Sequence, residues 1–325
     1  MTETTDRLSV DAQGGGALAA LGGVRPQAPG WFDAALARAP ERTRIDVEGA
    51  GIEVLAWGVR GKPGLLLLHG NGAHADWWSP LAPFFVDSGY RVAAMSWSGM
   101  GGSDWRAKYH PGTFAREALA ACEIAGLFEA PVKPVLVAHS FGGFLGLYCA
   151  ARYGERLGAA ISVDSPIEPP GYTHDRPPSR SRPNRVYPSV EDALARFRLA
   201  PQQGCENLWY LDHVARGSIK AADSGFTWKF DPFIWHEFEL GDPSPLLQRA
   251  SCPVAVIWGD RSSLMPPEVV AYMRSLAPAG SPFLAIPDAD HHVMIDQPLP
   301  FVAAVRGLLA GWPRGAQVAT GGGAV

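Results

Sequence analysis

Six short apolar runs recur along the chain, and helix-like segments separate them. The runs cover residues 65–68, 92–95, 135–138, 159–163, 254–258 and 283–286. Because these runs are almost entirely apolar and do not alternate with polar residues, they suit strands that are buried on both faces of a sheet. With helices expected at 113–127 and 141–153, the pattern predicts an α/β fold with a mostly parallel, doubly wound sheet.

The alternation is interrupted between residues 166 and 245. This stretch holds a loop rich in proline and arginine, a helix-like segment at 190–199 and a tract rich in aromatic residues. Since ligands of open α/β sheets bind outside the carboxyl ends of the strands, we interpret 166–245 as an inserted, largely helical lid over that edge. The core then comprises 31–165 and 246–313. Glycine-rich, low-complexity ends predict a disordered tail at 1–30 and a flexible tail at 314–325.

The motif with the most chemical content lies at residues 135–143, where an apolar strand runs directly into a turn around Ser140 and then into a helix. Ala138 and Gly142, two positions before and after the serine, are small enough to let strand and helix approach each other. The motif resembles the nucleophile elbow of the α/β hydrolases, with Ala138 in place of the more usual glycine. The resemblance implies the α/β-hydrolase fold with Ser140 as nucleophile. A serine that merely caps the helix is the alternative.

The strand at 65–68 leads into His69-Gly70-Asn71-Gly72, which resembles the oxyanion loop of the same superfamily. In that family one amide comes from the residue after His-Gly and the other from the residue after the nucleophile. The resemblance therefore implies that the oxyanion hole is formed by the backbone amides of Asn71 and Phe141, with Gly72 as the alternative to Asn71.

Two adjacent histidines, His291 and His292, follow the final apolar run and precede Pro298. The segment resembles the closing histidine loop of the family. In that pattern the catalytic histidine lies several residues before a proline that opens a helix, which favours His291 over His292 as the general base.

The position of the acid departs from the common family pattern. Many relatives carry Gly-x-x-Asp after the strand that corresponds to 254–258, but here a serine, Ser262, occupies the aspartate position, and Asp260 lies two residues earlier. Asp164, directly after the strand at 159–163, occupies a second acid location, resembling haloalkane dehalogenases and one branch of small esterases. We therefore favour Asp164 over Asp260 as the acid that orients the histidine.

The order Ser, Asp, His along the chain is that of the α/β hydrolases. The resemblance implies a serine hydrolase that cleaves an ester or related acyl bond of a small molecule through an acyl-enzyme. The aromatic lid favours an apolar or aromatic substrate, with Trp209, Trp228 and Trp235 as candidate binding residues. Two alternatives stay open: a carbon-carbon bond hydrolase of the ring-fission-product type, and a non-catalytic small-molecule-binding member of the fold.

Charge and cysteine usage exclude other classes of function. The net charge is −4 and no basic block is present, so we expect no nucleic-acid partner. The N-terminal segment resembles neither a signal peptide nor a membrane span, which predicts a cytoplasmic protein without a membrane partner. The four cysteines lack the spacing of metal or redox motifs, so we expect buried free thiols, no metal and no cofactor. The sequence carries no signal for the oligomeric state.

Overall fold

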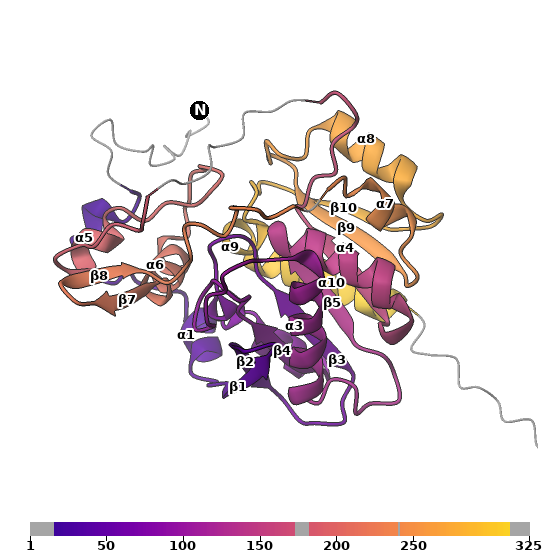
Figure 1. Cartoon of the computed structure of the whole chain (residues 1–325), viewed down its shortest axis with the longest axis horizontal. Helices are drawn as coiled ribbons and strands as arrows, with labels where there is room; N and C mark the ends of the chain where they lie inside the picture. The colour runs from indigo at the N-terminus through magenta and orange to yellow at the C-terminus, as the bar shows by residue number, and fades with distance from the viewer. Residues whose placement is uncertain (1–15, 173–181, 240, 313–325) are drawn as a thin grey trace, which may run out of the picture.

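The computed structural model describes residues 16–172, 182–239 and 241–312, and its centre is an eight-stranded sheet (Figure 1). The strand order is β1-β2-β4-β3-β5-β6-β9-β10. Strands β4, β3, β5, β6, β9 and β10 are parallel to one another. At one edge β1 and β2 form an antiparallel hairpin, and β2 also pairs antiparallel with β4. The bounds are β1 Glu41–Val47, β2 Ala50–Trp57, β3 Gly64–Leu68, β4 Arg91–Met95, β5 Val135–His139, β6 Ala159–Val163, β9 Val254–Gly259 and β10 Phe283–Ile286.

The six predicted runs correspond to the six parallel strands, and the predicted fold class is confirmed. Strand β3 shows why these runs are apolar at successive positions. All of its residues are buried, and successive leucines face opposite sides of the sheet. Leu65 and Leu67 pack in the apolar cluster that includes residues of α2 and α10, while Leu66 and Leu68 pack in the cluster that includes residues of α3, α4 and α8. Helices therefore cover both faces of the sheet. Their bounds are α2 Ala82–Asp87, α3 Pro111–Ile124, α4 Phe141–Tyr153, α8 Pro267–Leu276 and α10 Pro298–Gly311.

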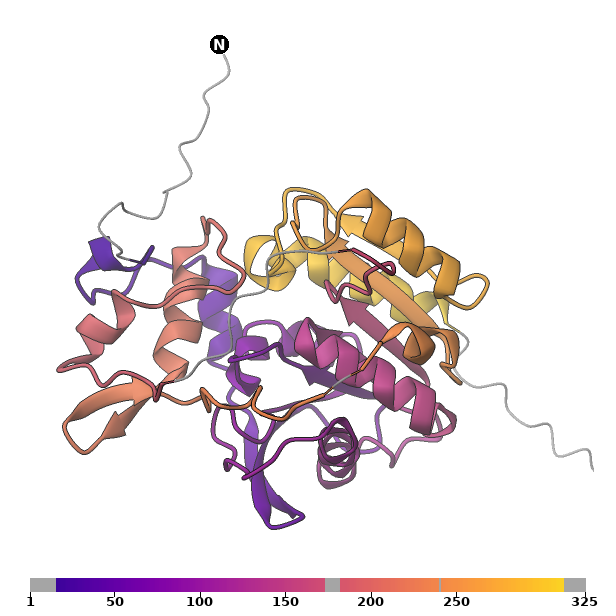
Figure 2. The same ribbon diagram turned by 45° about the horizontal axis from the view of Figure 1, so that its top comes forward.

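The segment between β6 and α7 (Ser244–Gln248), residues 166–243, is here called the insertion, and its helices and strands lie to one side of the sheet in Figure 2. They contain α5 (Val190–Leu194), α6 (Leu208–Gly217) and an antiparallel hairpin of β7 (Ile219–Ala222) and β8 (Gly225–Trp228). The expectation of a largely helical segment is thus only partly right. The helix predicted at 190–199 is shorter and ends at Leu194.

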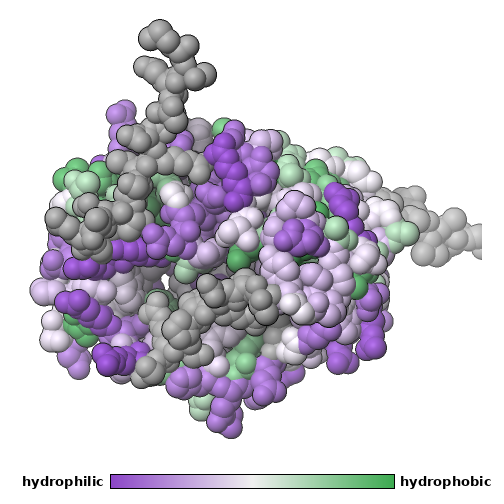
Figure 3. Space-filling view, turned by 90° about the horizontal axis from the view of Figure 1, so that it is seen from above, coloured by the Kyte–Doolittle hydropathy of each residue, from purple (hydrophilic) through white to green (hydrophobic). Residues whose placement is uncertain are grey.

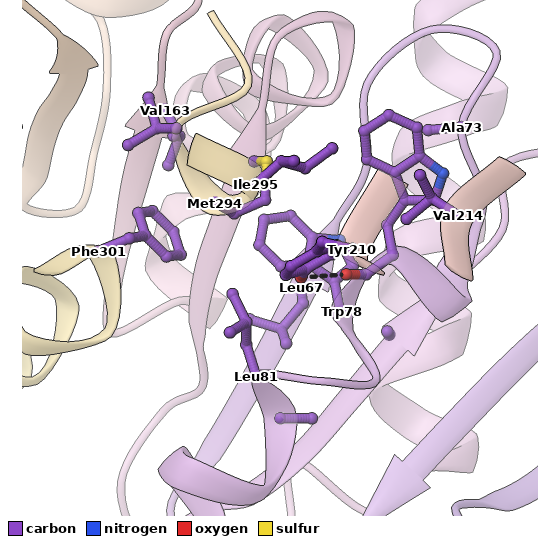
Figure 4. Close-up of a cluster of buried hydrophobic side chains, with 14 of the residues drawn as sticks. Leu67, Ala73, Trp78, Leu81, Val163, Tyr210, Val214, Met294, Ile295 and Phe301 are labelled. Atoms are coloured by element: carbon purple, nitrogen blue, oxygen red, sulfur yellow. Dashed lines mark hydrogen bonds between the residues drawn. The ribbon is translucent and has the colours of Figure 1, made fainter. Parts of the chain in front are cut away.

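The insertion shares its apolar core with the sheet. Figure 4 shows Tyr210 and Val214 of α6 among side chains that include Trp78 and Ile295. The Tyr210 hydroxyl donates to the backbone oxygen of Trp77 at 2.7 Å. Burying an aromatic or large aliphatic side chain stabilises a fold by about 1.5–3 kcal/mol, so a shared cluster of this kind resists separation of the insertion from the core.

Residues 16–30 pack against the insertion, which corrects the prediction of a disordered segment through residue 30. Leu18 is buried and precedes the 3-10 helix η1 (Ala19–Leu21). The Gly16 amide donates to the oxygen of Ala195, and Arg216 donates to the oxygen of Gly23. Glycine-rich composition hid the few apolar residues that anchor this segment. The rest of that predicted tail, residues 1–15, and the C-terminal tail predicted at 314–325 lie outside the described residues.

All four cysteines are buried and free, as predicted. In the described part of the chain, no helix has the length and apolar character needed to cross a bilayer. The face seen in Figure 3 carries hydrophilic residues over most of its area, and its hydrophobic residues are scattered between them.

Candidate active site

Ser140 lies at the junction between β5 and α4 and has a strained backbone. Its φ is 55° and its ψ is −121°, a conformation that non-glycine residues rarely adopt. The close packing around the turn explains the small residues of the motif. A Cβ atom at Gly142 would collide with the carbonyl oxygen of His69, and one at Gly143 would collide with the hydroxyl of Ser165. The sequence folds into a tight elbow here because these two positions carry no side chain.

A chain of two hydrogen bonds joins Ser140, His291 and Asp164. His291 Nε2 lies 2.9 Å from Ser140 Oγ, and His291 Nδ1 lies 2.7 Å from Asp164 Oδ1. The imidazole is 2% exposed and Asp164 is 0% exposed. Because a carboxylate only accepts hydrogen bonds, Nδ1 carries the proton and Nε2 is left to accept from the serine hydroxyl. This is the geometry of a nucleophile with its general base and the acid that orients that base.

Asp164 is held by three donors, two of which the sequence analysis did not foresee. Besides His291, the Gly259 amide donates to Oδ2 at 2.9 Å, and the Ser262 hydroxyl donates to Oδ1 at 2.7 Å. Ser262 is the serine that stands where many relatives carry an aspartate, and that departure was the available signal. Asp260 is exposed, and its backbone amide pairs with β10, so the structure does not bring it to the histidine.

The loop after β3 passes beside the nucleophile. A Cβ at Gly70 would lie 3.0 Å from the Cβ of Ser140. Phe141 is the first residue of α4, where amides point out of the helix without intrahelical partners. Asn71 is exposed in the loop, whereas the Gly72 amide already donates to Met100 Sδ at 3.2 Å. The Gly72 amide thus already has a partner, and Asn71 stays the prediction for the second amide.

A model of the alpha/beta hydrolase family matches residues 65–305. The chain belongs to the alpha/beta hydrolase family. The predicted resemblance is confirmed, and the protein is a hydrolase.

The hydrolase is 24% identical to an esterase of Mycobacterium tuberculosis, Rv0045c, over 83% of this chain and 89% of that protein. It is 25% identical to the pimeloyl-[acyl-carrier protein] methyl ester esterase of Edwardsiella ictaluri, over 75% of this chain and 92% of that protein. Among solved structures, the thioesterase domain from the curacin biosynthetic pathway superposes with a TM-score of 0.67 at 22% identity, covering 84% of this chain and 99% of that domain. The last similarity concerns the fold alone.

His69 of the hydrolase anchors the loop after β3. It is buried, its Nδ1 lies 2.7 Å from the Gly70 oxygen, and its Nε2 accepts from the backbone amide of Trp97 at 3.1 Å. Burial lowers the pKa of His69 to about 3, so the ring is neutral at neutral pH. A neutral ring can accept from Trp97 and donate to Gly70 at the same time, which fixes the course of the loop.

The second histidine of the pair lies away from the nucleophile. His292 is buried, and its Nδ1 lies 2.7 Å from the side-chain oxygen of Gln203 in the insertion. A third buried ring, His139, lies 3.0 Å through its Nε2 from the backbone oxygen of His291. Burial lowers the pKa of both His139 and His292 well below 6.5, so both rings are neutral. Of the two candidates for the base, the structure brings His291 to Ser140.

Of the three tryptophans predicted to bind substrate, the structure brings one into contact with Phe141, the residue that follows Ser140. Trp235 is 39% exposed, and its ring packs edge-on against Phe141 at 5.2 Å. Trp209 packs on Trp31 and Phe32 of the N-terminal part of the chain. Trp228 is buried inside the insertion against the rings of Tyr187 and Phe197. Trp209 and Trp228 thus pack in apolar cores, and their assignment to the pocket is corrected.

Among the described residues, no group of three or more His, Cys, Asp or Glu side chains is arranged to hold a metal ion.

Proposed function

We propose that this hydrolase is a serine esterase that cleaves an ester or related acyl bond of a small apolar or aromatic molecule through an acyl-enzyme. The hydrogen-bonded chain from Ser140 through His291 to Asp164 carries the proposal. The names of two relatives that share most of their length with this chain, both esterases, support the choice of bond.

The geometry accounts for each step of such a reaction. His291 Nε2 takes the hydroxyl proton as Ser140 Oγ forms a bond to the acyl carbon, and Asp164 stabilises the resulting imidazolium. The carbonyl oxygen gains negative charge, and the Asn71 and Phe141 amides donate to it. The C–O bond to the leaving group then breaks, and His291 returns the proton to the departing alcohol. Water activated by the same histidine releases the acid and regenerates the serine.

Aromatic residues around Phe141, which follows the proposed nucleophile, support an apolar or aromatic substrate. The rings of Phe141, Trp235 and Phe238 pack on one another with centroid distances of 5.2–5.6 Å. Aromatic side chains bury large areas with few polar demands, which suits binding of an apolar acyl or alcohol group. In this proposal Trp235→Ala raises KM several-fold for aromatic esters, whereas Trp209→Ala leaves KM unchanged.

The testing experiment measures hydrolysis of p-nitrophenyl esters of increasing acyl length by the wild type and by Ser140→Ala, with the initial burst recorded for acyl-enzyme. We expect a burst in the wild type and a loss of turnover of about 10⁴- to 10⁶-fold in the variant. Wild-type activity retained by Ser140→Ala would overturn the serine mechanism. A wild type that is inert towards every ester but labels at Ser140 with a fluorophosphonate would overturn the ester assignment and favour the carbon-carbon bond hydrolase.

A further inference from the structure

The loop that carries His291 is held from two sides, and one of the two sides belongs to the insertion. Gln203 lies between α5 and α6 and is half-buried. Its side-chain oxygen accepts from the backbone amide of His292 at 3.0 Å and lies 2.7 Å from His292 Nδ1. Its side-chain nitrogen donates to the carboxylate of Asp296 at 2.9 and 3.1 Å.

These contacts bracket the catalytic base. The carboxylate of Asp296 also accepts from the backbone amide of Asp290 at 2.8 Å, so the single side chain of Gln203 is linked to residues on both sides of His291. Asn207, also in the insertion, donates to the backbone oxygens of Ile295 and Asp296. Two amide side chains of the insertion, Gln203 and Asn207, therefore hydrogen-bond to the segment 290–296.

The chemistry of the network admits one orientation of the Gln203 amide. Both donors belong to His292: its backbone N–H and the Nδ1–H of its neutral ring each donate to the side-chain oxygen of Gln203. If the Gln203 amide were flipped, its NH₂ group would face these two donors and its oxygen would face the carboxylate of Asp296, so neither group would have a hydrogen-bond partner. Only a side chain with an acceptor on one branch and a donor on the other satisfies both partners at this distance.

We propose that Gln203 is a positioning residue, which holds His291 in hydrogen-bonding geometry from the insertion and so couples the placement of the insertion to the efficiency of the catalytic base. Removing its amide leaves two donors of the buried His292 without their acceptor and deprives Asp296 of a donor. The loop then relaxes, and His291 Nε2 moves relative to Ser140 Oγ. The inference rests on the proposed serine mechanism.

The first test compares Gln203→Met, which keeps the length of the side chain without its hydrogen bonds, with Gln202→Met at the exposed neighbouring glutamine. Steady-state hydrolysis of the best p-nitrophenyl ester and the rate of fluorophosphonate labelling at Ser140 are measured below the unfolding transition of each variant. We expect kcat and the labelling rate of Gln203→Met to fall about 10- to 100-fold with KM unchanged, because small displacements of reacting groups cost this much. Gln202→Met should match the wild type.

A second test is a rescue by exchange of the two groups. Gln203→Glu alone places a carboxylate oxygen opposite the carboxylate of Asp296, and its kcat should fall. In the double variant Gln203→Glu with Asp296→Asn, the donor and the acceptor of this contact change places while the net charge is conserved. We expect the double variant to recover at least ten-fold in kcat over Gln203→Glu.

The outcomes separate this inference from the proposed function. Wild-type kcat and labelling rate in Gln203→Met, together with an inactive Ser140→Ala, would overturn the positioning role alone. An active Ser140→Ala would overturn the serine mechanism itself. A third outcome would also contradict the proposal. If kcat of Gln203→Met falls without rescue by the exchanged pair, and Gln202→Met loses as much activity, then Gln203 contributes only to the general stability of the structure.

Discussion

The two sides of the histidine loop differ in how the chain builds them. On the core side, the groups that hold Asp164 follow the ends of neighbouring parallel strands. Val163 pairs with Ile257 across β6 and β9, which brings Asp164 next to the Gly259 amide. On the insertion side, Gln203 reaches the loop from a connection without regular secondary structure. The register of the sheet thus determines the position of Asp164, whereas the packing of α5 and α6 determines the position of Gln203.

Replacement of the acid tests the core side with the largest expected effect. Asp164→Asn keeps the shape of the side chain but can present an N–H to Nδ1 of His291. This contact stabilises the tautomer with its proton on Nε2, which cannot accept the proton of Ser140. We expect kcat/KM to fall about 10⁴-fold in ester hydrolysis. Asp260→Asn is the matched control and should remain within two-fold of the wild type, roughly the scatter of surface substitutions. Equal activity of the two variants would contradict the assignment of Asp164.

Replacement of Ser262 tests how far the acid depends on its neighbours. Ser262→Ala removes one of the three donors to Asp164 and leaves the contact with His291 in place. A hydrogen bond to a charged group contributes about 1.5–3 kcal/mol, so we expect kcat/KM to fall about 10- to 100-fold. Ser263→Ala, at the exposed adjacent serine, should have no effect. A loss as large as that of Asp164→Asn would show that the acid cannot be held by Gly259 alone.

The contact between His74 of the core and α6 of the insertion can be tested through the pH dependence of the free energy of unfolding. His74 is buried, its Nε2 lies 3.0 Å from the oxygen of Val214 in α6, and burial lowers its pKa to about 4. Because the folded-state pKa lies below the unfolded value of about 6.5, the unfolded state binds more protons between these two values. This contribution to stability is complete above pH 6.5 and is lost as the pH falls towards 4.

We expect the free energy of unfolding, measured with urea between pH 7.5 and 4.5, to decrease on acidification. His74→Gln, which can still donate to Val214, should reduce the slope by up to about 1.4 kcal/mol per pH unit. An unchanged slope would mean that His74 is protonated in the folded state at the lower end of this range.

The parallel part of the sheet could be predicted because its strands are mostly apolar and do not alternate with polar residues. The hairpin of β1 and β2 was missed because most of β1 is exposed and its residues 41–46 are largely charged or polar. Such an edge strand lacks the continuous apolar signal of a strand buried on both faces. The β7–β8 hairpin was missed for a similar reason, since its strands are four residues long and mostly polar or half-buried.

Ser140, Asp164 and His291 could be found from the sequence because each directly follows a strand or lies in a loop of recognisable pattern. Gln203 could not be found, because a glutamine in an irregular connection carries no periodicity and its partners lie 89–93 residues away. Aromatic composition also failed to separate a pocket from a core. Trp228 and Trp235 lie seven residues apart, yet the first is buried inside the insertion and the second is exposed and packs on Phe141, the residue after Ser140.

The order of the site along the chain has a consequence for its synthesis. His291 hydrogen-bonds to an acid 127 residues earlier and to a serine 151 residues earlier, and the insertion lies between them. At translation rates of about 5–20 residues per second, Ser140 and Asp164 precede His291 by about 6–30 s. A nascent chain therefore exposes its strained serine without a base and gains reactivity only when its last strand and helix join the sheet. A break within the insertion would divide the enzyme into two inactive fragments, each carrying part of the catalytic set, and activity on mixing would report their reassembly.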